Sequence, residues 1–153
     1  CLFSEYGRAD RLDTNTFTGN KVTLWRWRDD FQNDFAARMA WCTESYKEAN
    51  HPPVPVLANP DHLTVKSGEG FGLDASGSYD PNGDSLSFLW FTYPEAGSYK
   101  GEISIVPENA HGAYVVAPEV NKPETIHFIL RVTDKGTPPL SRCKRVIVTV
   151  LPK

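Results

Sequence analysis

The pattern of hydrophobic and polar residues divides the chain near residue 50. Before that point, large apolar side chains recur at helical spacing, and Asp29 or Asp30 stands where an N-terminal cap belongs, with Gln32 three residues after Asp29. The proline pair at 52–53 ends the pattern. We therefore expect a helix over about residues 30–49. Its apolar stripe is Phe31, Phe35, Met39, Cys42 and Tyr46.

Residues 51–153 have a different pattern. Short runs of β-branched and aromatic residues alternate with clusters of Pro, Gly, Asp and Ser at intervals of about ten residues, which is typical of a β-sandwich of the immunoglobulin-like class. The chain as a whole is thus predicted to be mainly β. The predicted strands are 55–58, 62–66, 71–74, 85–93, 103–106, 113–116, 125–133 and 142–151, and residues 21–27 form a further strand before the helix.

Alternation along the long strands assigns their two faces. The inner face is predicted to hold Leu86, Phe88, Trp90, Ile126, Phe128, Leu130, Val132, Val146, Val148 and Val150. The outer face carries a second apolar group, Leu89, Phe91, Ile129 and Ile147, and an apolar outer patch normally marks an interface. We therefore expect the helix, or neighbouring N-terminal structure, to dock on this outer face, with Phe31, Phe35 and Met39 packed against it.

Length and charge exclude several classes of function. The 153 residues suffice for one domain plus an extension, and a net charge of −3 gives no electrostatic footprint for nucleic acid or an anionic membrane. No apolar run approaches the roughly 20 residues of a membrane span. Cys1, Cys42 and Cys143 lie too far apart for a zinc motif, and their odd number requires at least one free thiol.

The loop from Asp74 to Asp84 is the densest cluster of oxygen donors. Such loops suit calcium, with Asp80, Asn82 and Asp84 as the candidate ligands, although the spacing does not match an EF-hand. The alternative is a network of turns in which Asp and Ser side chains bind backbone amides. We favour the turn network and keep calcium as the second interpretation.

Four aromatic residues are candidates for binding a sugar. Trp25 and Trp27 could present flat rings from the predicted strand at 21–27, although core or interface packing is the commoner use of tryptophan. Tyr93 and Tyr99 flank a loop, where packing is again the alternative. No combination of nucleophile, base and carboxylates forms a catalytic motif. We expect no enzymatic activity from this chain alone.

Several stretches carry a family resemblance. Residues 52–151, above all "LDASGSYDPNGDSLSFLW", resemble the PKD-type and cadherin-like repeats of secreted and cell-surface proteins. The combination of "LWRWRDDFQNDFAARMAWC", "EANHPP", "WFTYPEAGSYKG" and "IHFILRVTDKGTPPLSRCKRVIVTV" is similar to the C-terminal region of the secreted cellulose-binding proteins whose N-terminal domain is nucleoside-hydrolase-like.

This resemblance implies an accessory role. Residues 1–50 would be the tail of a preceding hydrolase-like domain and residues 51–153 an accessory sandwich, in a secreted, periplasmic or cell-surface protein associated with polysaccharide. Two alternatives remain. The chain could contribute loops to an active site of its parent, through Arg26, Arg28 or Asp34, or it could be a calcium-dependent adhesion-type repeat.

Overall fold

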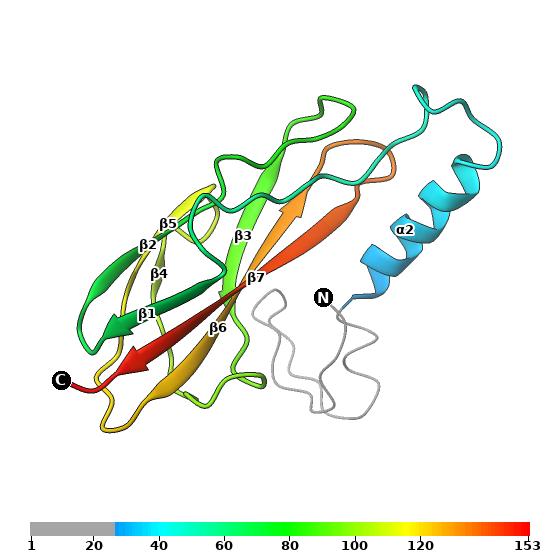
Figure 1. The fold of residues 1–153 in the computed structure, drawn as a ribbon. Coiled ribbons are helices and arrows are strands. Elements are labelled where there is room, and N and C mark those ends of the chain that lie inside the picture. Colours follow the sequence, from blue (N-terminus) through cyan, green and yellow to red (C-terminus); the bar gives the residue numbers. More distant parts are fainter. Residues whose placement is uncertain (1–26) are drawn as a thin grey trace.

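The computed structural model describes residues 27–153 as one helix and a β-sandwich (Figure 1). The four-stranded sheet has the order β1-β7-β6-β3, in which β1 runs parallel to β7 and the other neighbours are antiparallel. The three-stranded sheet has the order β2-β5-β4. The elements are α2 (Arg28–Ala40), β1 (His62–Lys66), β2 (Gly70–Asp74), β3 (Ser87–Thr92), β4 (Ile105–Val106), β5 (Gly112–Val116), β6 (Glu124–Thr133) and β7 (Ser141–Leu151).

The core lies between the two sheets, on the faces that alternation predicts. Trp90, Phe128 and Val148 have no exposed surface, and the indole Nε1 of Trp90 donates a hydrogen bond of 3.1 Å to the carbonyl of Ala110. Without this bond, the only polar atom of the Trp90 side chain would be buried without a hydrogen-bond partner. The other predicted inner residues of β6 and β7 are also buried, while Leu86 and Phe88 are partly buried and pack against the core.

Seven of the eight strands predicted after residue 50 are present, within two residues at most ends. The exception is 55–58, where the chain makes only an isolated bridge between Val54 and Tyr79. Prolines at 52, 53, 55 and 60 explain the difference, because each removes the amide donor that a strand ladder needs. The strand predicted at 21–27 lies almost wholly outside the described residues.

The start of the helix differs from the prediction. Its N-cap residue is Trp27, which makes no side-chain capping bond, so the prediction that Asp29 or Asp30 caps the helix is wrong. Both aspartates lie instead inside the first turn. There their carboxylates complement the positive end of the helix dipole without capping it.

The end of the helix also differs from the prediction, because α2 stops at Ala40 and residues 41–49 form turns. The backbone amide and the hydroxyl of Ser45 both donate to Glu48 Oε2, at 3.4 and 2.8 Å. Serine bonds of this kind offer the backbone an alternative to continuing a helix. The predicted range of 30–49 is therefore too long at its C-terminal end.

Candidate functional site

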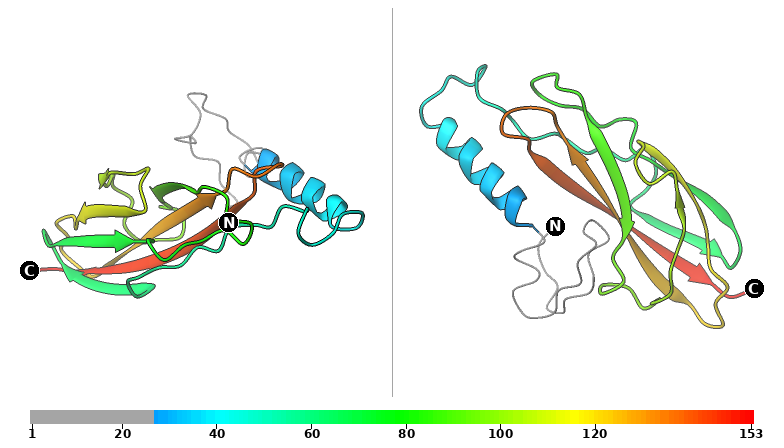
Figure 2. Two further views of the ribbon diagram at one scale, coloured as in Figure 1. Left: turned by 90° about the horizontal axis from the view of Figure 1, so that it is seen from above. Right: turned by 180° about the vertical axis from the view of Figure 1, so that it is seen from behind.

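Helix α2 lies beside the ends of β6 and β7, far from the three-stranded sheet (Figures 1 and 2). Two ion pairs fasten it there: Arg131 Nη2 donates to Asp30 Oδ1 at 2.7 Å, and Arg142 Nη2 donates to Asp34 Oδ1 at 3.2 Å. Just before the helix, Trp27 is 7% exposed and packs against Phe91, with 6.5 Å between the ring centroids. The prediction that N-terminal structure docks on the outer face of this sheet is therefore confirmed.

The residues that make this contact are not the predicted ones. Phe31, Phe35 and Met39 are 39%, 65% and 53% exposed, so the prediction that they pack against Leu89, Phe91, Ile129 and Ile147 is wrong. The helix presents instead the face at residues 27, 30, 34 and 37, because Arg131 and Arg142 attract its aspartates. A helix can turn only one face to a neighbour. The apolar stripe Phe31–Phe35–Met39, hereafter the α2 stripe, consequently points elsewhere.

The Asp34 carboxylate joins two arginines. The hydrogen bond from Arg38, at 2.7 Å, and then that from Arg142 lower the pKa of Asp34, although partial burial opposes them. Asp34 therefore stays ionised over the whole neutral range. The Asp34–Arg142 pair is partly exposed to solvent, so it adds little to the free energy of unfolding.

The linker after the helix is held by a buried polar contact. Asn50 Nδ2 donates to Asp134 Oδ2 at 3.2 Å and to the carbonyl of Pro138 at 2.8 Å. Asp134 has no exposed surface, and its Oδ1 accepts from the amides of Gly136 and Leu140. This network joins the end of the N-terminal extension to the loop between β6 and β7.

Three rings gather where the extension meets the sandwich. His51 stacks on Trp41, with 5.9 Å between centroids and an interplanar angle of 11°, and Tyr46 approaches His51 to 4.1 Å. The Nε1 of Trp41 also donates to the carbonyl of Asn50 at 2.7 Å. These contacts lie within residues 41–51, so they hold this segment together, while Asn50 joins it to the sandwich.

The oxygen-rich loop forms the turn network that we favoured. Asp80 Oδ1 accepts from the amides of Asn82 and Asp84, at 2.8 and 3.2 Å. Asn82 also binds the linker, since its Oδ1 accepts from the amide of His51 and its Nδ2 donates to the carbonyl of Ala49. Within residues 27–153 no three His, Cys, Asp or Glu side chains gather closely enough to hold a metal ion. Calcium binding at this loop stays a prediction.

The aromatic residues proposed as sugar ligands have mixed outcomes. Trp27 is buried under Arg131, whose Cζ lies 5.8 Å from the ring centroid, so it offers no open platform. Tyr99 packs against the core, and Tyr93 is partly buried. Trp25 and Arg26 lie outside the described residues. Tyr93 therefore stays a prediction, while the ligand assignments of Trp27 and Tyr99 are not supported by their positions.

The cysteines that the structure describes differ in state. Cys42 is a free, exposed thiol, as the odd cysteine number requires, and Cys143 on β7 is disulfide-bonded.

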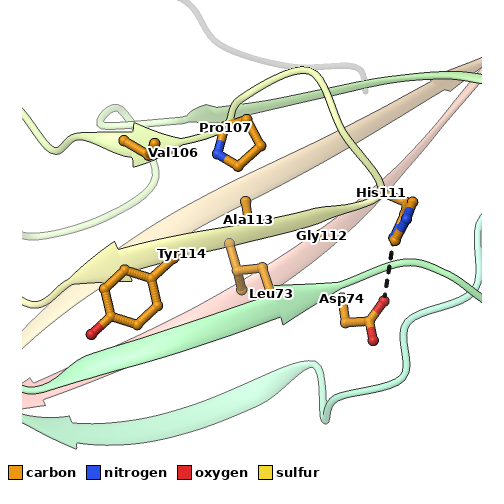
Figure 3. Close-up of a pocket in the computed structure, with 8 residues that line it drawn as sticks. All are labelled: Leu73, Asp74, Val106, Pro107, His111, Gly112, Ala113 and Tyr114. Atoms are coloured by element: carbon orange, nitrogen blue, oxygen red, sulfur yellow. Dashed lines mark ion pairs between the residues drawn. The ribbon is translucent and has the colours of Figure 1, made fainter.

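A shallow pocket lies on the outer face of the three-stranded sheet (Figure 3). Tyr114 stands at one end, and the pair of Asp74 and His111 stands at the other, with Asp74 Oδ1 4.0 Å from His111 Nδ1. Val106 of β4 and Pro107, the residue after that strand, line one side. Sequence analysis missed this pocket. Its one signal in the sequence was glycine at residues 70 and 72, which leaves two outward positions of β2 without a side chain.

The Asp74 carboxylate is held in its ionised form. The amide of Ser76 donates to Asp74 Oδ1 at 2.8 Å, and this bond is the main cause that lowers the pKa of Asp74. The side chain is half exposed. The pocket thus combines an exposed phenol ring with a fixed hydrogen-bond acceptor.

Comparison with known proteins places the chain in a family. The family model of the cellulose-binding protein Sde0182, C-terminal domain, matches residues 70–150. No curated protein matches the chain. Among solved structures, a nucleoside hydrolase-related hypothetical protein from Saccharophagus degradans, associated with carbohydrate metabolism, matches with a TM-score of 0.81 and 40% identity over 88% of this chain. The match covers 34% of that protein, so this chain spans about a third of its relative's length.

Two further solved structures match less closely. The PKD domain of the KIAA 1837 protein has a TM-score of 0.49 and 20% identity, over 65% of this chain and 89% of that one. A mouse protocadherin, PcdhgC3, has a TM-score of 0.39 and 18% identity, over 65% of this chain and 34% of that one. None of the helices within residues 27–153 is long and apolar enough to cross a membrane.

Proposed function

Because the chain belongs to the family of the cellulose-binding protein Sde0182 C-terminal domain, we propose that it is a non-catalytic accessory unit of a longer, secreted or cell-surface protein. In this proposal it binds polysaccharide and supports a nucleoside-hydrolase-like domain. The family description and the carbohydrate-associated relative from S. degradans support the polysaccharide and the partner domain.

The orientation of α2 is the observation that supports this role. Its acidic face is fastened to Arg131 and Arg142, while the α2 stripe stands in solvent with Phe35 65% exposed. Contiguous exposed apolar side chains on a folded protein usually mark a contact with another protein surface. We therefore assign the α2 stripe to the interface with the hydrolase-like domain, and residues 1–50 to the tail of that domain.

The rigid linker fits this role. Asn50 and Asn82 hold residues 49–51 on the sandwich, so a domain bound to α2 would be kept in one orientation relative to the rest of the chain. A flexible linker would instead let the two parts move independently. The catalytic groups of the assembly, on this proposal, belong to the partner domain.

A chimaera tests the proposal. The third of the S. degradans relative that this chain matches is replaced by this chain, and thermal unfolding is followed by calorimetry. We expect one cooperative transition, because the α2 stripe joins the two parts. Phe35→Asp places a charge in the interface and should split the transition into two.

Val116→Asp is the matched control. Val116 is 55% exposed but lies on the three-stranded sheet, away from α2, so this variant should keep the single transition. If the Phe35→Asp and Val116→Asp chimaeras unfold alike, the α2 stripe is not the interface and the supporting role is refuted.

A further inference from the structure

Tyr114 lies flat across the neighbouring strand. Its Cα partner on β2 is Gly72, and a Cβ atom built on the next outward residue, Gly70, would lie 1.7 Å from the Tyr114 hydroxyl oxygen. The ring therefore occupies the space that a side chain at residue 70 would fill. Since Tyr114 is 56% exposed, one side of this ring faces solvent.

The surface continues on both sides of Tyr114. Val106 on β4 is its other Cα partner and is 60% exposed, and Val116, two residues along β5, is 55% exposed. Toward Asp74 the floor is bare: a Cβ on Gly72 or Gly112 would meet nothing nearer than a backbone carbonyl, at 4.0 and 3.9 Å. The result is an open groove with the flat Tyr114 ring as the floor at one end.

The far end of the groove supplies polar groups. The Asp74 carboxylate and the His111 imidazole, whose side chains are 50% and 64% exposed, close that end (Figure 3). Hydrogen bonds from hydroxyl groups to a carboxylate are stronger than those between neutral groups. The fixed negative charge of Asp74 also disfavours an anionic ligand, so a neutral, hydroxyl-rich ligand suits this groove best.

We infer that the groove between Tyr114 and Asp74 binds one chain of a neutral β-linked glucan. A pyranose ring stacks its apolar face on the exposed face of Tyr114, and hydroxyl groups of a neighbouring sugar donate to Asp74. Tyrosine suits this task because it gives a large rigid contact surface with a polar edge. This inference rests on the polysaccharide part of the proposed function and gives it a location.

The competing explanation is structural. Aromatic side chains that cover glycine on a neighbouring strand can stabilise a sheet without binding anything. The two explanations differ in what removing the ring changes. A structural ring alters stability only, whereas a ligand platform alters affinity for sugar.

The test is a depletion assay of the 153-residue chain on microcrystalline cellulose. We expect Tyr114→Ala to weaken binding at least tenfold and Tyr114→Phe to stay within twofold of wild type, because the phenyl ring keeps the stacking surface. Tyr79→Ala removes a tyrosine of similar exposure, 55%, from a loop outside the groove and should bind as wild type does. Circular dichroism and thermal unfolding check that each variant is folded.

Backbone amide signals give a second readout that needs no variant. Titration with cellohexaose should shift the NMR signals of Gly70, Gly72 and Gly112, which lie under or beside the groove. If wild type binds cellulose, but Tyr114→Ala binds equally well and these glycine signals do not move, the site is elsewhere and only this inference fails. If wild type binds no cellulose, or binds an anionic polysaccharide in preference, the polysaccharide part of the proposed function fails with it.

Discussion

Replacing Asn50 by alanine should lower the free energy of unfolding, and the buried network allows us to estimate by how much. The change removes the two hydrogen bonds that Asn50 Nδ2 donates and leaves Asp134 Oδ2 and the Pro138 carbonyl without these donors. A buried polar group without a partner costs about 1–3 kcal/mol, and a charged group costs more. Asn50 Oδ1 is itself buried without a partner in the described chain, so its removal recovers roughly 1 kcal/mol. The expected net loss is about 3 kcal/mol.

Urea denaturation followed by tryptophan fluorescence measures this loss. With a slope of about 1.5 kcal/mol per molar urea, the midpoint should fall by about 2 M. Asn82→Ala is the control, because it removes two hydrogen bonds to the same linker from an exposed asparagine and should cost only about 1 kcal/mol. If Asn50→Ala costs no more than Asn82→Ala, the buried contact does not hold the linker and our description of a rigid extension is wrong.

Two further predictions concern pH and metal. Burial, followed by the charges of Arg145, His62 and Lys100, lowers the pKa of His127 below its ordinary 6.5. As the pH falls, His127 therefore takes up a proton at a higher pH in the unfolded chain than in the folded chain. The free energy of unfolding should therefore fall as the pH drops through about 6.5, and His127→Gln should reduce that fall; equal pH dependence in urea titrations of both proteins would contradict this. Because Asp80 is engaged in turn bonds, EDTA should leave the melting temperature unchanged, whereas a rise of several degrees on adding calcium would restore the metal interpretation.

The strands were predictable because their information is local. In β6 from Ile126 onward and in β7 from Val146 onward, every second residue is apolar and enters the core, so alternation alone identifies Phe128 and Val148 as buried. Turn-forming residues between the strands indicated where most of the strands begin and end. The missing strand at 55–58 shows the limit of this approach, because prolines there outweigh the β-branched valines.

The docking of α2 was not predictable from its own sequence. The α2 stripe is the more apolar face, but the neighbour that the helix meets carries Arg131 and Arg142, and their positions are known only once β6 and β7 are paired. The groove at Tyr114 was missed for a similar reason. Tyr114 and Gly70 are 44 residues apart in sequence, and only the register of β2 with β5 brings them together.

The central claim is that this chain supports a partner domain through its helix. Hydrogen exchange on α2 tests this claim most directly. The exchange of amides 31–39 is compared between the 153-residue chain and the chimaera with the remaining part of the S. degradans relative. We predict at least tenfold slower exchange in the chimaera, because burial of the α2 stripe suppresses local opening of the helix. Equal exchange in the two proteins would contradict the claim.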